Sequence, residues 1–129
     1  MGRIKTEISE GELLDKISIL EIKLSKIKDE NLLKEVKKEY EILIKLKKEN
    51  INSSQKIESL YKDLKMTNEQ IWVIENEKRL FEKNSDVREK FIQVCRDEYI
   101  TNDKRAKIKR EINNILDSYI KEVKQHTKY

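Results

Sequence analysis

Proline is absent from the 129-residue sequence, and glycine occurs only twice, at Gly2 and Gly11. Almost nothing in the chain therefore interrupts the hydrogen-bond ladder of a helix, and the abundant Lys, Glu and Leu favour helix. Two glycines cannot build a P-loop or a G-x-G-x-x-G loop, which excludes nucleotide-binding folds of those types. We expect one all-α domain over residues 1–129, an antiparallel bundle of long helices.

Charged residues make up 42% of the chain and apolar residues 36%. Because an average domain is about 25% charged, each helix should bury one narrow stripe and expose the rest. The sequence shows no apolar stretch of the length that a membrane span or signal peptide needs, so we expect a soluble, cytoplasmic protein without a membrane partner. With one cysteine, Cys95, and one histidine, His126, we expect no disulfide, no metal and no cofactor.

Apolar residues spaced three and four apart predict a series of long helices. The first begins at Ser9, because Ser9 and Glu12 have capping-box spacing, and its apolar stripe runs from Leu13 to Ile27. A phase slip at residues 29–31 predicts a tight turn or a kink. The second stripe then comprises Leu32, Val36, Tyr40, Leu43 and Leu46.

Short polar residues at 50–54 end the second helix, because their side chains compete for backbone hydrogen bonds. We expect the third helix at about residues 55–83, a break with Ser85 or Asp86 as N-cap, and the fourth helix from about 87 to 116. The residues of the third helix that we expect to point inward are Ile57, Leu60, Leu64, Ile71, Ile74 and Phe81.

The two ends of the chain have a different pattern. Residues 4–8 alternate apolar and polar side chains, and residues 118–123 do so less regularly. Two predictions stay open, a small two-stranded ribbon formed by the termini or additional helix at the C-terminus.

The segment 91–116 carries the most informative pattern. Positions that repeat every three or four residues, and so lie on one helix face, are apolar at both ends of this segment but polar in its middle. Because a buried charge is costly unless it is paired, the polar positions need either solvent or a bound partner. In the functional interpretation they line a pocket whose arginine and lysine bind the oxygens of an anion. These positions are Glu98, Asn102, Arg105 and Lys109, with Arg96 and Tyr99 on the neighbouring stripe.

The alternative is a turn at residues 101–103, because Thr, Asn and Asp are preferred cap residues. A new helix would then begin after Asp103. The polar side chains that follow would lie on the surface.

A second polar set recurs along one face of the third helix. An indole beside an arginine offers a platform on which a planar base or a sugar could stack. In the alternative interpretation Trp72 packs in the core, while Glu75 and Arg79 form a surface ion pair. The set comprises Asn68, Trp72, Glu75, Arg79 and Glu82.

The charge run at residues 104–110 comprises Lys104, Arg105, Lys107, Lys109 and Arg110. Such a run could bind nucleic-acid phosphates, but nearby acidic residues dilute it, and a solvated helix face is the favoured interpretation. Cys95 lies in core phase with no histidine near it in sequence, so we expect an inert side chain. Because no catalytic constellation stands out, we expect no enzyme activity.

Three segments carry a resemblance to a known family: residues 8–23 (ISEGELLDKISILEIK), 72–82 (WVIENEKRLFE) and 102–113 (NDKRAKIKREIN). They resemble a family of small, uncharacterised, all-helical proteins found in bacteria and tailed phages, some encoded near surface-glycan genes. The resemblance implies a helical fold and no established activity. It implies an acid at Asn76 and a glycine at Asp117, and it stresses Glu12, Lys16, Trp72, Glu75, Arg79, Arg96, Tyr99, Asn102, Asp103, Arg105, Lys109, Glu122 and Lys124.

The leading hypothesis is a non-enzymatic, oligomeric binder of a small phosphorylated anion, a nucleotide or nucleotide-sugar derivative. A phage protein of this kind could act as a sponge for a host nucleotide signal. The alternatives are an adaptor that docks onto a protein partner and weak nucleic-acid binding through residues 104–110. The expected ligand-binding residues are Lys16, Trp72, Arg79, Arg96, Tyr99, Asn102, Arg105 and Lys109.

Oligomerisation is expected because narrow apolar stripes bury little surface within one chain of this length. The candidate contact between copies is the stripe that begins at Leu32, which is out of phase with the first helix. The alternative is an antiparallel helix hairpin that buries both stripes internally.

Overall fold

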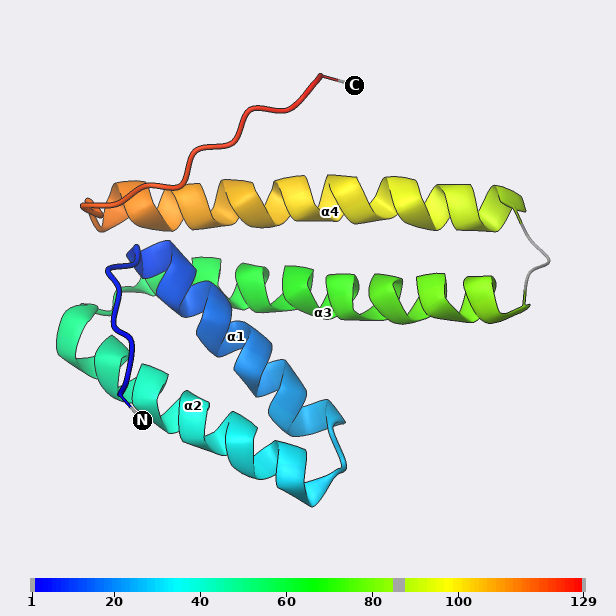
Figure 1. The fold of residues 1–129 in the computed structure, drawn as a ribbon. Helices are drawn as coiled ribbons and strands as arrows, with labels where there is room; N and C mark the ends of the chain where they lie inside the picture. The colour runs from blue at the N-terminus through cyan, green and yellow to red at the C-terminus, as the bar shows by residue number, and fades with distance from the viewer. Residues whose placement is uncertain (1, 85–87, 129) are drawn as a thin grey trace.

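The structure is a computed structural model that describes residues 2–84 and 88–128 (Figure 1). The predicted all-α bundle is confirmed, and the described residues include no strand. The helices of this part of the chain are α1 (Glu10–Lys26), α2 (Glu30–Asn50), α3 (Gln55–Asn84) and α4 (Arg88–Ile115).

Local capping sets the helix boundaries that the sequence predicted. The Ser9 hydroxyl accepts a hydrogen bond from the Glu12 backbone N–H at 3.1 Å, whereas the Glu12 carboxylate pairs with other residues instead of completing the capping box. Asp29 accepts hydrogen bonds from the first backbone amides of α2, so the phase slip at residues 29–31 is a turn between two helices. The predicted caps Ser85 and Asp86 lie outside the described residues.

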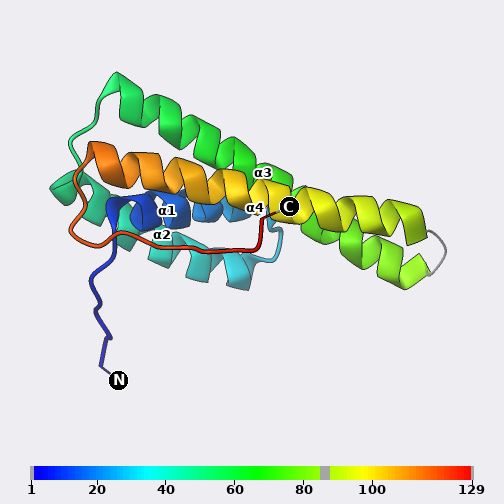
Figure 2. The same ribbon diagram turned by 90° about the horizontal axis from the view of Figure 1, so that it is seen from above.

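Helices α3 and α4 run antiparallel along most of their length, and α1 packs against both of them (Figure 1). The main apolar core lies where α1 meets these two helices. The other ends of α3 and α4 extend beyond α1 and α2 (Figures 1 and 2). The core comprises Leu14 of α1, Ile57, Leu60 and Leu64 of α3, and Ile108 and Ile112 of α4.

Helix α2 lies antiparallel to α1 and packs mainly against it (Figure 1). It has no fully buried residue. In its apolar stripe, Val36, Tyr40 and Leu43 are half-buried, whereas Leu32 and Leu46 are exposed. The two helices therefore form the hairpin of the alternative interpretation, although they leave part of the stripe uncovered. Association of two copies stays a prediction.

The predicted ribbon between the termini is wrong. Residues 2–8 form no strand, while residues 118–128, the C-terminal tail, run back along α4 (Figures 1 and 2). The tail is not helical either. The physical reason is that the tail binds to α1 and α4 through its polar side chains Ser118 and Glu122, so the termini do not pair with each other.

The tail leaves α4 at Asp117, whose φ of 50° is in the left-handed region. The Ser118 backbone N–H donates to the Asn113 carbonyl at 2.9 Å, as in a helix C-terminus that usually carries glycine. This is the position at which the family resemblance implies glycine. Asp117→Gly should therefore raise the free energy of unfolding by roughly 0.5–1 kcal/mol, because glycine adopts positive φ without a Cβ clash.

Urea denaturation tests this prediction. The side chain of Asp117 is 98% exposed, and its ion pair with Lys121 is long, at 3.9 Å. Loss of this carboxylate should therefore cost little stability by itself. The matched variant Asp117→Ala, which keeps a Cβ, should give no gain in stability. Equal effects of the glycine and alanine variants would show that the backbone at this position carries no strain.

Candidate functional site

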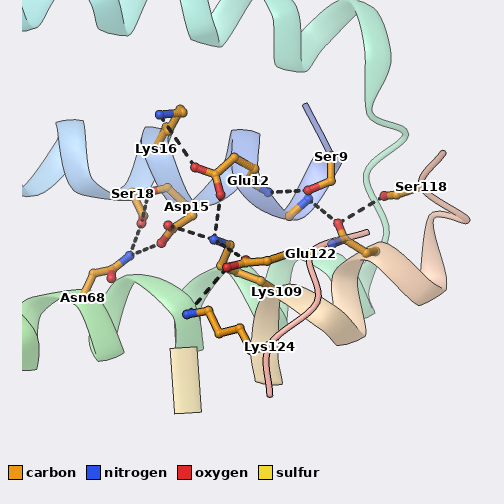
Figure 3. A network of polar contacts seen from close by, with 12 residues as sticks. Ser9, Glu12, Asp15, Lys16, Ser18, Asn68, Lys109, Ser118, Glu122 and Lys124 are labelled. Atoms are coloured by element: carbon orange, nitrogen blue, oxygen red, sulfur yellow. Dashed lines mark hydrogen bonds and ion pairs between the residues drawn. The ribbon is translucent and has the colours of Figure 1, made fainter. Parts of the chain in front are cut away.

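The side chain of Lys109 on α4 is only 7% exposed and lies among three carboxylates (Figure 3). Its Nζ is 2.7 Å from Glu12 Oε2, 3.0 Å from Glu122 Oε2 and 3.5 Å from Asp15 Oδ2. These contacts join α1, α4 and the C-terminal tail. We refer to Glu12, Asp15, Lys109 and Glu122 as the Lys109 network.

The contacts within the Lys109 network favour the charged forms of Lys109 and Glu122. Burial lowers the pKa of Lys109, but its hydrogen bonds to Glu12 and Glu122 and the charge of Asp15 outweigh burial, so this pKa lies above its ordinary value. The hydrogen bond from Lys109 lowers the pKa of Glu122. A buried ammonium ion is thus matched by carboxylates, which indicates a structural role for Lys109 rather than a free donor for a ligand.

The network continues from Asp15 into α3 (Figure 3). The amide Nδ2 of Asn68 donates to Asp15 Oδ1 at 2.8 Å and to Ser18 Oγ at 2.7 Å. The Oδ1 atom of Asn68 is buried and accepts no hydrogen bond from the described residues. Asn68 therefore joins the Lys109 network to α3, and its side chain keeps one acceptor atom without a donor.

Helices α1 and α4 approach each other closely at Gly11, next to Glu12 of the Lys109 network. The Gly11 backbone N–H donates to Asn113 Oδ1 at 2.7 Å. The hydroxyl of Ser118 contacts the same Asn113 atom and the Glu10 carboxylate, which fixes the start of the tail. Gly11 permits this geometry because any Cβ there would lie 2.6 Å from Asn113 Oδ1.

Arg105 lines two clefts. The first, which we call the Trp72 cleft, has a volume of about 320 Å³ between α1, α3 and α4, and its walls include Ile22, Trp72 and Arg105. The second, which we call the tail cleft, has a volume of about 760 Å³ between α4 and the tail. Its walls include Asn102, Arg105 and Lys128. One guanidinium group therefore borders both spaces.

Arg105 itself is half-buried and has no ion-pair partner among the described residues. Its Nε is buried and donates to no acceptor, and its guanidinium forms no ion pair with any residue in the described ranges. A buried donor without an acceptor costs roughly 1–3 kcal/mol, so the fold gains nothing from holding it there. Such a group is a candidate contact for a ligand that carries negative charge.

The alternative of a turn at residues 101–103 is wrong, because α4 is continuous from Arg88 to Ile115. The Thr101 hydroxyl donates back to the Asp97 carbonyl at 2.6 Å, so this cap-forming residue is accommodated inside the helix. The polar positions of segment 91–116 consequently lie on one uninterrupted helix, as the pocket interpretation requires.

The predicted ligand-binding residues lie in different parts of the structure. Their contacts with a ligand stay predictions. Lys16 is exposed and lies 3.7 Å from Glu12, and Arg96 is exposed and lines neither cleft. Lys109 belongs to the Lys109 network, Trp72, Arg79 and Arg105 line the Trp72 cleft, and Tyr99, Asn102 and Arg105 line the tail cleft.

Trp72 is half-buried, so it is neither an exposed platform nor a full core residue. The predicted surface ion pair beside it is confirmed, with Arg79 Nη1 2.9 Å from Glu75 Oε2 and the Arg79 side chain 71% exposed. The hydrogen bond from Arg79 lowers the pKa of Glu75. Arg79 is therefore partly neutralised, which leaves Arg105 as the stronger candidate for an anion.

Sequence reasoning from spacing missed several residues of this region. Asn113 and Ser118 gave no periodic signal, and the approach of the tail to α4 depends on contacts between distant positions. One usable signal was Gly11, because a glycine inside a predicted helix often marks a close approach of two backbones. The cationic tail residues Lys124 and Lys128 also line a cleft that spacing along one helix could not reveal.

Comparison with known protein families gives a match over nearly the whole chain. The family model described as "Family of unknown function (DUF6165)" matches residues 4–128. The chain belongs to this family. No curated protein and no solved structure matches it significantly. Within the described residues, no helix is both long and apolar enough to cross a bilayer, and no group of three or more His, Cys, Asp or Glu side chains could hold a metal ion.

Proposed function

We propose that this member of the family is a non-enzymatic binder of a small anionic ligand, a nucleotide or nucleotide-sugar derivative, and that Arg105 contacts its phosphate. The observation that carries the proposal is the half-buried side chain of Arg105, which lines two clefts, forms no ion pair within the part of the chain that the structure describes, and has a buried Nε without an acceptor there. A planar guanidinium binds two oxygens of a phosphate at once, which gives it both affinity and orientation.

The Trp72 cleft supports the organic part of such a ligand. Its volume of about 320 Å³ is at the lower end of the range for small-molecule sites. The half-buried Trp72 and the apolar side chains Ile19 and Ile22 offer surface to a base or sugar ring, and the unsatisfied Oδ1 of Asn68 offers an acceptor. The cleft also contains the Glu75–Arg79 ion pair, so Arg105 is the charged donor of its wall that such a pair does not occupy.

The finer parts of the proposal concern the biological setting. An oligomeric protein of this kind, encoded by a phage and present in the host cytoplasm, would act as a sponge that sequesters a host nucleotide signal. The uncovered part of the α2 stripe, with Leu32 56% exposed, supports association with a second copy.

Arg105→Ala should weaken ligand binding by roughly 1.5–3 kcal/mol, because it removes a charge-assisted contact. The melting temperature of the empty protein should stay the same or rise, because the variant removes a buried donor that has no acceptor. Thermal-shift assays with ribonucleoside mono- and diphosphates and sugar nucleotides would identify the ligand. Titration calorimetry of wild type and variant then measures the loss.

Lys107→Ala is the matched control, because Lys107 is exposed on the same helix and lines neither cleft. It removes the same charge and should change affinity by less than about 0.5 kcal/mol. If both variants lose affinity equally, the effect is one of net charge and Arg105 is no specific contact. If no phosphate ligand shifts the melting temperature of the wild type, the proposed function is wrong.

An adaptor that docks onto another protein is a second candidate. It is favoured by exposed apolar side chains in the second half of α3 and the first half of α4, where Leu80 is 58% and Ile92 49% exposed. Copurification of a stoichiometric protein partner without a bound small molecule would support it. Nucleic-acid binding through residues 104–110 has less support, because Arg105 and Lys109 of that run point inward.

A further inference from the structure

The C-terminal tail is fastened to the helices at two places. Ser118 contacts Asn113 and Glu10 where the tail leaves α4, and Glu122 binds the buried ammonium group of Lys109 at 3.0 Å (Figure 3). After the second of these contacts the tail continues along α4 (Figures 1 and 2). The Lys109 network therefore determines where the last residues of the chain lie.

Beyond Glu122, two lysines and a histidine occupy every second position of the tail. Lys124, His126 and Lys128 all line the tail cleft. Thr127 lines the cleft as well, so side chains from successive positions near the end of the tail reach this space. Arg105 borders the same space from α4, so donors converge on the cleft from two separate parts of the chain.

Acidic residues in the tail cleft do not cancel this arrangement. Glu98 lines the cleft but contacts Lys78, and Asp103 also lines it. Arg105, Lys124 and Lys128 bring three permanent positive charges against these two carboxylates. Lys124 is 3.6 Å from Glu122, an exposed pair that a phosphate could replace at low cost.

We propose that the tail cleft binds a chain of two or more phosphoryl groups, which spans from Arg105 to the tail residues Lys124 and Lys128. This inference rests on the proposed function and names its ligand class as a nucleoside diphosphate or a diphosphate-linked sugar nucleotide. The phosphoryl group nearest the nucleoside lies at Arg105, the residue that lines both the Trp72 cleft and the tail cleft. The next phosphoryl group lies between Arg105 and the tail.

The dimensions of the site favour a diphosphate over a monophosphate. A single phosphate can be satisfied by the fork of Arg105 alone, and it would leave most of the 760 Å³ tail cleft to water. A diphosphate brings oxygens to donors on both walls. Glu122 would then be a positioning residue, because it holds the tail through Lys109 without lining the tail cleft.

Titration calorimetry on the full chain tests the inference with orthophosphate, pyrophosphate and the matched ribonucleoside mono- and diphosphates. Wild type should bind pyrophosphate at least about tenfold more tightly than orthophosphate, and nucleoside diphosphates about tenfold more tightly than monophosphates. The double variant Lys124→Ala, Lys128→Ala should lose about tenfold in affinity for pyrophosphate and diphosphates. Its affinity for monophosphates should stay within about twofold of wild type.

Lys121→Ala is the matched control in the same tail, because Lys121 does not line the tail cleft. It should leave every affinity within about twofold of wild type. Glu122→Gln, which weakens the attachment of the tail, should reduce pyrophosphate affinity in the same direction as the double variant. Both sets of changes lie in the exposed tail, and the melting temperature of each variant checks that the helices remain folded.

The outcomes separate this inference from the proposed function. If the double variant binds diphosphates as tightly as wild type while Arg105→Ala loses nucleotide binding, the tail is no part of the site and only the inference is wrong. Equal affinity of wild type for mono- and diphosphates overturns the inference in the same way. If none of the phosphate probes binds wild type, both the inference and the proposed function are wrong.

Discussion

Lys109→Met should lower the free energy of unfolding by about 3–5 kcal/mol, the largest effect that we expect of any single substitution in this chain. The variant keeps the length and most of the volume of the side chain but removes its charge. Asp15, whose side chain is 7% exposed, would then remain buried without an ion-pair partner, and Glu12 and Glu122 would lose their shared cation. Urea denaturation of wild type and variant measures the difference.

Lys107→Met is the control for this substitution, because Lys107 lies on the same helix but is exposed. It should change stability by less than about 0.5 kcal/mol. The comparison also tests the sequence-based assignment of Lys109 to a ligand site. A variant of Lys109 that keeps or gains stability would mean that this lysine serves a ligand and that the Lys109 network does not hold the fold together.

Gly11→Ala should destabilise the protein by about 1–3 kcal/mol, the usual cost of overpacking a filled space. A Cβ at this position would lie 2.6 Å from Asn113 Oδ1 and 2.7 Å from the Lys109 carbonyl oxygen. The second of these is backbone, so α1 and α4 would have to separate. Helix propensity alone predicts the opposite sign, a gain of about 1 kcal/mol, because alanine is the better helix former.

Packing and helix propensity predict changes of opposite sign in the free energy of unfolding, so this substitution distinguishes between them. Gly2→Ala is the matched control, because nothing lies within 4 Å of a Cβ built at Gly2, and it should have no measurable effect. Urea denaturation again provides the measurement. If Gly11→Ala stabilises the protein, α1 and α4 do not approach each other as closely as described, and the hydrogen bond from Gly11 to Asn113 is not a fixed feature of the fold.

The helices could be predicted because the signals that define them are local. Ser9 and Asp29 cap helices through their own nearest amides, and residues 50–54 end α2 without help from the rest of the chain. The continuous α4 was harder to predict, because Thr101 belongs to the cap-forming residue types. Burial of Ala106 and Ile108 against the core outweighs that local preference.

The candidate site could be predicted only in part. The polar interruption of the α4 stripe correctly marked Arg105 and Lys109 as unusual, but spacing could not tell that Lys109 has carboxylate partners and that Arg105 has none within residues 2–84 and 88–128. The carboxylate partners of Lys109 come from distant parts of the chain. Glu12 and Asp15 precede Lys109 by 97 and 94 positions, and Glu122 lies in the folded-back tail. The family resemblance stressed Glu12, Lys109 and Glu122, and the structure brings these three together.

A crystal structure of the full chain with the nucleoside diphosphate that produces the largest thermal shift would test the central claim most directly. Our account predicts phosphate oxygens at about 2.7–3.1 Å from the Arg105 guanidinium, with the nucleoside against Trp72. The second phosphoryl group should face Lys124 and Lys128. Ligand density away from Arg105, or an Arg105 that pairs with a carboxylate while the ligand is bound elsewhere, would contradict the assignment of this arginine as the anion-binding residue.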